Sequence, residues 1–271
     1  MTSDYIAMGP WQLAFAAALI LINLIFSMML KLQLEKMLWV ASLRMVSQLL
    51  LLGYVLEWIF ALQNFVMILG LALMMATVAS VSAVSRTRRR FGTIYLSSFM
   101  SVAVSSCFIT SIALAGIVQI EPWYHPQYFF PLLGMVLGNT LNGISLALDR
   151  FMEDLSARQN QIESLLAIGA TRWEAAHDSV KEAARTGMIP IINSMMVMGI
   201  VSLPGMMTGQ ILAGALPLDA VYYQIVIVFM IASASALGVI LIILMAFHCL
   251  LNTRHQLCTA RLHTKPSGKR K

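Results

Sequence analysis

The polar side chains of this chain that could do chemistry lie within long apolar stretches. The stretch 128–148 carries Asn139 and Asn142 three residues apart, which places both amides on overlapping faces of one helix. At membrane depth an amide needs a partner or water, so the pair predicts a path for a polar solute. A further polar position, Gln48, follows Arg44 by four residues. The long Arg44 side chain is expected to reach the lipid headgroups instead.

A second candidate is the segment 201–214, with the sequence VSLPGMMTGQILAG. Pro204 removes a backbone hydrogen bond and predicts a kink near residues 200–201. Gly205 and Gly209, four residues apart, would let another backbone approach closely. Two interpretations stay open: a kinked packing helix, or a gate that lines the substrate path. The residues assigned to such a gate are Pro204, Gly205, Met206, Met207, Gly209 and Gln210.

Metal-binding side chains give a weaker signal. The chain has 20 methionines, but thioethers favour Cu(I), whereas Fe(II) prefers imidazole and carboxylate ligands. Methionine also fills gaps in protein cores, which is the interpretation we adopt. The tail offers a loose cluster whose spacing matches no established metal site, formed by His248, Cys249, His255 and Cys258.

These residues are carried by a chain whose composition is that of an integral membrane protein. Of its 271 residues 59% are hydrophobic and 11% are charged, against roughly 25% charged residues in a soluble domain. We predict an all-α, polytopic membrane protein with about seven transmembrane helices in a single permease domain that covers residues 1–271. The predicted spans are residues 11–30, 43–60, 62–84, 93–119, 128–148, 189–213 and 220–250.

The basic residues orient these spans. If the amino terminus lies outside, all 18 Lys and Arg residues fall in cytoplasmic segments, including the basic tail 252–271. This is the positive-inside pattern, so the net charge of +6 indicates membrane topology and contact with lipids rather than nucleic-acid binding. The carboxyl terminus is therefore expected in the cytoplasm.

The sequence also excludes some activities. The pattern G-x-x-x-x-G-K-[ST] is absent, so we predict no ATPase site, no catalytic residue and no bound cofactor in this chain. If ATP drives the protein, another subunit must hydrolyse it. A seven-span receptor or sensor remains an alternative, although the last span lacks the lysine that a retinal protein needs.

The cytoplasmic segment 149–187 predicts two amphipathic helices separated by a turn at Gly169. Thr171 and Glu174 have the spacing of a capping box that starts the second helix. The sequence ESLLAIGA resembles the E-A-A-x-x-x-G loop of ABC-transporter permeases, which docks on the ATPase subunit. Pro190 lies farther from the glycine than in importer loops, and a helix pair lying on the lipid surface is the alternative. The expected coupling residues are Glu163, Gly169, Ala170, Arg172 and Trp173.

Several motifs together resemble one family. SLPGMMTGQILAG, YQIVIVFM, RHQL, QLLLLGYVLEWIF, GMVLGN and IGATRWEAA are similar to the FetB-type permeases of bacterial iron-export ABC transporters, over about residues 35–257. Plant relatives of that family act in aluminium tolerance, with a nucleotide sugar proposed as cargo. The resemblance implies a permease of the bacterial inner membrane that exports iron or another metal species. It also implies two permease copies and a separate ATPase subunit that binds ATP and Mg. An organic or nucleotide-sugar cargo is the alternative.

Overall fold

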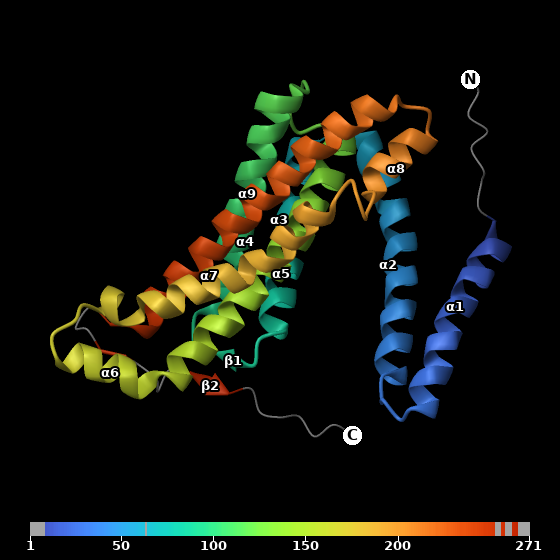
Figure 1. The fold of residues 1–271 in the computed structure, drawn as a ribbon. Coiled ribbons are helices and arrows are strands. Elements are labelled where there is room, and N and C mark those ends of the chain that lie inside the picture. Colours follow the sequence, from blue (N-terminus) through green and yellow to red (C-terminus); the bar gives the residue numbers. More distant parts are fainter. Residues whose placement is uncertain (1–8, 63, 253–255, 258–261, 265–271) are drawn as a thin grey trace. The chain divides into compact units, whose positions relative to one another are not determined.

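The computed structural model of the chain describes residues 9–62, 64–252, 256–257 and 262–264 (Figure 1). Most of them are helical. The helices are α1 (Pro10–Met29), α2 (Glu35–Leu62), α3 (Phe65–Ser85), α4 (Ile94–Ile112) with a π-helical continuation (Ala113–Val118), α5 (Pro126–Ala157), α6 (Gln159–Ala167), α7 (Arg172–Val197), α8 (Gly205–Leu212) and α9 (Pro217–Leu250). Two short strands, β1 (Arg89–Arg90) and β2 (His263–Thr264), pair antiparallel.

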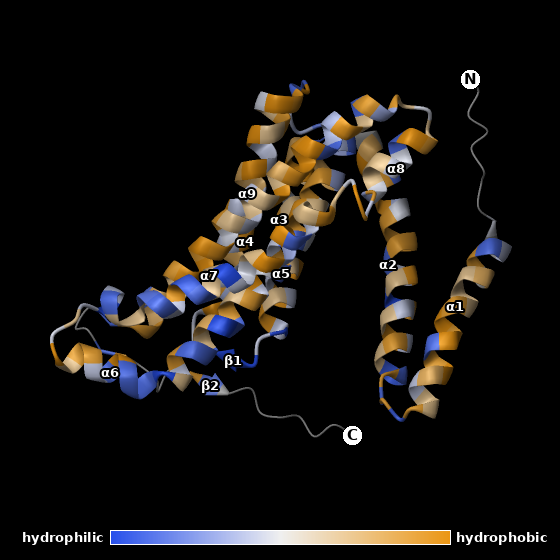
Figure 2. Cartoon of the chain, viewed as in Figure 1, coloured by the Kyte–Doolittle hydropathy of each residue, from blue (hydrophilic) through white to orange (hydrophobic). Residues whose placement is uncertain are grey.

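Six of the described helices are long and apolar enough to cross a membrane: α1, α2, α3, α4 with its continuation, α5 and α9. Figure 2 shows hydrophobic residues along these helices and hydrophilic ones gathered on α6. In lipid every backbone polar group must be satisfied within the protein, which is why such apolar runs are helical. The protein is therefore a polytopic all-α membrane protein.

The chain divides into two compact units, which we describe separately. The first contains α1, α2 and residues 209–216. In its helical hairpin the Ser27 hydroxyl donates to the Glu35 carboxylate over 2.9 Å and accepts from the Leu34 N–H over 3.2 Å. Almost all side chains of α1 and α2 are exposed, as expected of helices that face lipid.

The second unit is a bundle of α3, α4, α5, α7 and α9, with α6 attached. Its two most extensive helix contacts join α5 to α7 and to α9. Helix α7 runs antiparallel to α5, because Gly187 meets Gly143 and Glu182 lies beside Arg150 farther along. Helix α7 covers only the first part of the span expected over residues 189–213 and is not among the six candidate spans, so a seventh crossing stays a prediction.

The remaining directions follow from contacts of α4 with α9. A Cβ built on Gly238 of α9 would lie 2.9 Å from the Ser105 hydroxyl of α4. Nearer the end of α9, Cys249 lies 3.6 Å from the Thr93 hydroxyl at the start of α4. These two helices are thus antiparallel and closely packed.

Small residues set the closest helix approaches. A Cβ on Gly187 would lie 2.8 Å from the Gly143 carbonyl oxygen, and one on Gly238 would lie 2.7 Å from Thr140 Cγ2. A Cβ on Gly205 or Gly209 meets no atom of the described chain within 4 Å, so the close approach expected there stays a prediction. The glycines that pack within the bundle are Gly143, Gly187 and Gly238.

The segment expected to be a kinked span is interrupted instead. Helix α7 ends at Val197, a tight turn follows with Gly199 at φ +85°, and α8 begins at Gly205. Pro204 thus precedes a helix and lies outside any helix interior, and its carbonyl accepts from the Thr208 N–H over 3.0 Å. A proline just before a first turn costs no helical hydrogen bond, so no kink forms near residues 200–201.

Candidate functional site

One end of the bundle carries many of its basic residues, and we call it the arginine end. It includes Arg86 and Arg88 after α3, Arg150 on α5 and Arg172 at the start of α7. Contacts bring these segments together: the Arg88 N–H donates to Asp149 over 2.8 Å, and an Arg172 side-chain nitrogen donates to the Leu251 carbonyl over 3.3 Å.

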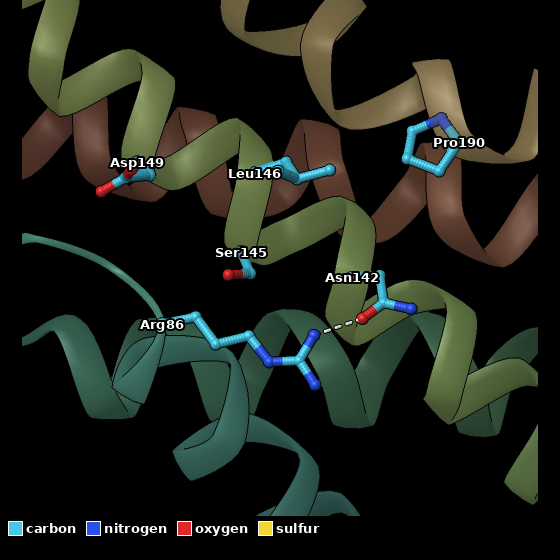
Figure 3. A pocket seen from close by; sticks show the side chains of 6 residues that line it. All are labelled: Arg86, Asn142, Ser145, Leu146, Asp149 and Pro190. Carbon is cyan, nitrogen blue, oxygen red and sulfur yellow. Dashed lines mark hydrogen bonds between the residues drawn. The ribbon is translucent and has the colours of Figure 1, made fainter. Parts of the chain in front are cut away.

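A polar cavity of about 370 Å³ opens at this end, lined by Arg86, Asn142, Ser145, Leu146, Asp149 and Pro190 (Figure 3). The Arg86 guanidinium donates to the Asn142 side-chain carbonyl. Asp149 carries the cavity's carboxylate and already accepts from the Arg88 backbone. The cavity thus combines one guanidinium, one carboxylate and one amide, a set that binds polar or ionic solutes.

Of the two asparagines predicted to line a path, only Asn142 reaches this cavity. Asn139 is exposed, and its side-chain amide donates to the Met135 carbonyl one turn earlier over 2.9 Å. The roles of Arg86 and Asp149 were missed in the sequence. Their signal was available, since Arg86 opens the cluster of four arginines that follows α3.

The turn predicted at Gly169 is present between α6 and α7. We call α6, residues 168–171 and the first turns of α7 the α6–α7 hairpin. Gly169 adopts φ +98° between the helices, a conformation that favours glycine. Ile168 beside it is 82% exposed. The hairpin therefore presents an apolar side chain at its tip.

The capping box is formed as predicted. The Thr171 hydroxyl accepts from the Glu174 N–H over 3.3 Å, and the Glu174 carboxylate accepts from the Thr171 N–H over 2.8 Å. These bonds from the Thr171 backbone and side chain lower the pKa of Glu174. Glu163, the one acidic residue assigned to coupling, is exposed on α6 and accepts from the Gln159 amide over 2.8 Å.

Aromatic and cationic contacts join the hairpin to the bundle. Trp173 packs edge-on against Phe247 of α9, with centroids 5.5 Å apart. The Arg172 guanidinium lies 5.5 Å from the centre of the same ring. A displacement of the hairpin would therefore reach α9 directly.

Farther along α7 from the hairpin, a charged contact joins this helix to α5. Arg150 lies 3.5 Å from Asp154 and 3.8 Å from Glu182 of α7. Asp154 is buried, and one of its carboxylate oxygens has no hydrogen-bond partner among the described residues. Loss of Arg150 would leave this carboxylate buried without a counter-charge, which is destabilising.

The remaining residues predicted to line a path or gate lie on α2 and α8. Gln48 is exposed on α2, Met206 and Met207 are half-buried on α8, and the Gln210 side-chain oxygen is buried without a partner among the described residues. Their assignment to a path or gate remains a prediction.

The tail cluster is described only in part. His248 is exposed, and its Nδ1 lies 2.8 Å from the Leu244 carbonyl, while Cys249 contacts Thr93. His255 and Cys258 lie outside the described residues. Within the described ranges no three His, Cys, Asp or Glu side chains gather in a way that could hold a metal ion.

The fold and the arginine end define a multi-span helical membrane protein with a helical hairpin at one end of its bundle. Residues 10–250 match UPF0014, described as an uncharacterised protein family, and the chain belongs to that family. No solved structure matches the chain.

Three relatives show the range of the family. A UPF0014 membrane protein of Synechocystis is 38% identical over 82% of this chain and 85% of its own length. The probable iron export permease protein FetB of Escherichia coli is 31% identical over 94% of this chain and 96% of its own length. The protein ALUMINUM SENSITIVE 3 of Arabidopsis thaliana is 30% identical over 85% and 83%, respectively. The multi-span fold and the bacterial relatives agree with a location in the inner membrane.

Removing the Thr171 cap should loosen the start of α7. In Thr171→Ala the Glu174 amide loses its acceptor, and we expect its hydrogen exchange to rise about fivefold, the factor for a cap worth about 1 kcal/mol. In the wild type the lowered pKa of Glu174 makes the box fully effective above the carboxyl's unfolded pKa. Its protection should be lost as pH falls through the lowered folded value. Hydrogen-exchange rates of the Glu174 amide, corrected for their intrinsic pH dependence, test both the cap and its pH dependence. Equal rates in Thr171→Ala and the wild type would contradict the contribution of the cap.

Proposed function

We propose that the chain is the permease subunit of an ABC exporter that moves iron, or another metal species, out of the cytoplasm. The observation that carries this proposal is the α6–α7 hairpin at the arginine end, with an exposed isoleucine beside a left-handed glycine. An apolar tip outside the bilayer suits burial in a groove of a partner protein. The relative named as an iron export permease matches along nearly its whole length, which supports the transport class and the cargo.

The proposed partner is an ATPase subunit that binds ATP and Mg and docks on the hairpin, with two copies of each subunit in the complex. Trp173 and Arg172 would pass the displacement of the hairpin to Phe247 and so to α9. The shared Arg150 contact would pass it to α5 and α7 together. Glu163, Gly169 and Ala170 are proposed to shape the docking surface.

A second cargo class has one observation in its favour. The Arg86 guanidinium lines the cavity at the arginine end, and guanidinium is a preferred partner of phosphate. A phosphorylated organic solute such as a nucleotide sugar would bind there. A bare cation would be repelled by the same group.

Two measurements test the function. A tagged permease extracted in mild detergent is expected to co-purify with a nucleotide-binding subunit. Cells that lack the gene are expected to accumulate iron under iron and peroxide stress, compared with complemented cells. Absence of any ATPase partner would favour the receptor or sensor class. Unchanged iron with a bound ATPase would redirect the cargo to an organic solute.

Substitution of Arg86 distinguishes a metal cargo from a phosphorylated organic cargo. Purified Arg86→Gln should lose any thermal stabilisation by a uridine diphosphate sugar, while iron content in complemented cells should stay at the wild-type level. Failure of Arg86→Gln to restore iron export would place the metal path at this cavity.

A further inference from the structure

A second polar region lies in the bundle, on the opposite side of α5 from the cavity. Serine and threonine dominate the buried face of α4, which packs against α5 and α9. We define the polar seam as the buried residues Ser106, Thr110, Thr140, Gln224 and Ser235, each at most 8% exposed. In each of them a side-chain oxygen lacks a hydrogen-bond partner among the described residues.

Unpartnered hydroxyls are unusual in a membrane helix. Serine and threonine there normally donate to the carbonyl one turn earlier, as Ser105 does to Ser101 over 2.6 Å. Ser98 instead donates across to the Ser80 carbonyl of α3 over 3.3 Å. A buried polar atom that makes no bond costs free energy. The seam residues differ from their neighbours on α4 in this respect, and a change of state that admits water would satisfy them.

The seam follows the contact between α4 and α9. Gln224, Ser235 and Gly238 lie on one face of α9. Ser235 follows Gln224 by 11 residues and Gly238 follows it by 14, and both separations are close to a whole number of helical turns. Gly238 meets Ser105 of α4 and Thr140 of α5, which places this face against both helices. The unpartnered oxygens therefore extend from the middle of the bundle toward the end opposite the arginine end.

At the arginine end the same contact opens into a pocket. This pocket of about 410 Å³ lies between α4 and α9, and its lining combines Thr93, Ser97 and His248 with Met245 and three leucines. Just beyond it the Ser101 hydroxyl lies 3.7 Å from the Met245 sulfur. Polar groups thus lie along this contact from the pocket to Ser235, and Gln224 follows on the same face of α9 beyond the buried Ile227, Val228 and Ile231.

The two helices that form this contact carry no formal charge along it. No Lys, Arg, Asp or Glu occurs in residues 94–112 or 220–247. Hydroxyl and amide oxygens can replace part of the hydration shell of a metal ion without a competing positive charge. The cavity that contains Arg86 lacks this property.

We propose that the polar seam is the route of a hydrated metal cation, which enters from the pocket between α4 and α9 as these helices separate. This inference rests on the proposed export function and names the path that the cargo takes. Asn142 and Arg86 then fasten the segment after α3 to α5 instead of lining the path.

Thiol labelling tests the route without reference to cargo. The background has Cys107, Cys249 and Cys258 replaced by alanine or serine and retains ATPase binding. Ser106→Cys, Thr110→Cys and Ser235→Cys are labelled in inside-out vesicles that contain the complete complex, with a positively charged methanethiosulfonate. Phe108→Cys is the matched control, because Phe108 is 56% exposed on the outer surface of α4. A thiol reacts as its thiolate, which forms only where water reaches it.

The seam cysteines are expected to react at least about tenfold faster than Phe108→Cys, with a rate that changes when ATP is added. Rates equal to the control would overturn the route. Fast labelling at a rate that does not change when ATP is added would indicate a static hydrated pocket, and this result would also overturn the proposed route. Loss of ATPase co-purification or of iron export in the unmodified protein would count against the proposed function, whatever the labelling shows.

A pair of alanine variants gives a second readout. Ser235→Ala removes an unpartnered hydroxyl, so its melting temperature should equal or exceed the wild type while export falls. Ser98→Ala removes a bonded hydroxyl, so its melting temperature should fall. If a double variant that combines Ser235→Ala with Thr110→Val exported at the wild-type rate, the proposed route would be contradicted.

Discussion

Gly187→Val should prevent the bundle from reaching its native packing. A Cβ at this position would lie 2.8 Å from the Gly143 carbonyl oxygen and 3.0 Å from a Val239 methyl. Backbone cannot move aside as a flexible side chain can, so α7 would be forced away from α5 and α9. Overpacking of this kind costs roughly 1–3 kcal/mol, and more where backbone is the obstacle. The melting temperature and the monodisperse yield in detergent measure the loss.

Gly138→Val is the matched control for that experiment. Gly138 lies on α5, and a Cβ there meets no described atom within 4 Å. Both variants introduce the same β-branched residue into a helix, so the difference between them isolates the steric term. Equal melting temperatures for the two variants would show that the glycine contact does not hold α7 in place.

Ile168→Glu should abolish association with the ATPase subunit. The isoleucine is 82% exposed at the tip of the α6–α7 hairpin, and its burial in a partner groove would contribute about 1.5–3 kcal/mol. Replacing it with a carboxylate removes this term and adds a desolvation cost, so binding should weaken by more than about tenfold. Co-purification from detergent and vesicle ATPase activity give the readout, with normal membrane levels of the permease.

Lys181→Glu provides the control for charge. Lys181 is exposed farther along α7, and the substitution also introduces a carboxylate. We expect it to retain the ATPase. Normal association of Ile168→Glu would exclude the hairpin tip as the docking point, and equal loss in both variants would point to a general charge effect.

Much of the helical architecture could be predicted because the signal is local. Apolar runs long enough to cross a bilayer are visible in the sequence, and α3, α4 and α9 lie where such runs occur. The turn at Gly169 and the box of Thr171 with Glu174 depend on residues only a few positions apart. The sequence placed these correctly.

The features that could not be predicted depend on which helix faces which. Gly205 and Gly209 have the spacing of a packing motif, but the glycines that pack within the bundle are Gly143, Gly187 and Gly238. A glycine becomes a contact only when another backbone arrives opposite it, and no local pattern encodes that. The effect of Pro204 was also misjudged, because a proline stops a helix or precedes one according to where the preceding helix ends.

The candidate site was only partly foreseen for the same reason. Asn142 was identified as a polar residue at membrane depth, but its partner Arg86 lies 56 positions away in the chain. The seam of hydroxyls was missed because serine and threonine in a membrane helix normally satisfy themselves locally. Only the packed structure distinguishes a bonded hydroxyl from an unpartnered one.

The polar character of α7 has a consequence for how the protein is made. Helix α7 packs along α5 and α9, yet it is absent from the six described helices that are long and apolar enough to span a membrane. The hydrophobicity by which the insertion machinery recognises a membrane segment is therefore weak in this helix. Its packing against α5 depends instead on the close approach of Gly187 to Gly143, so this glycine pair would decide whether α7 takes its place during membrane assembly.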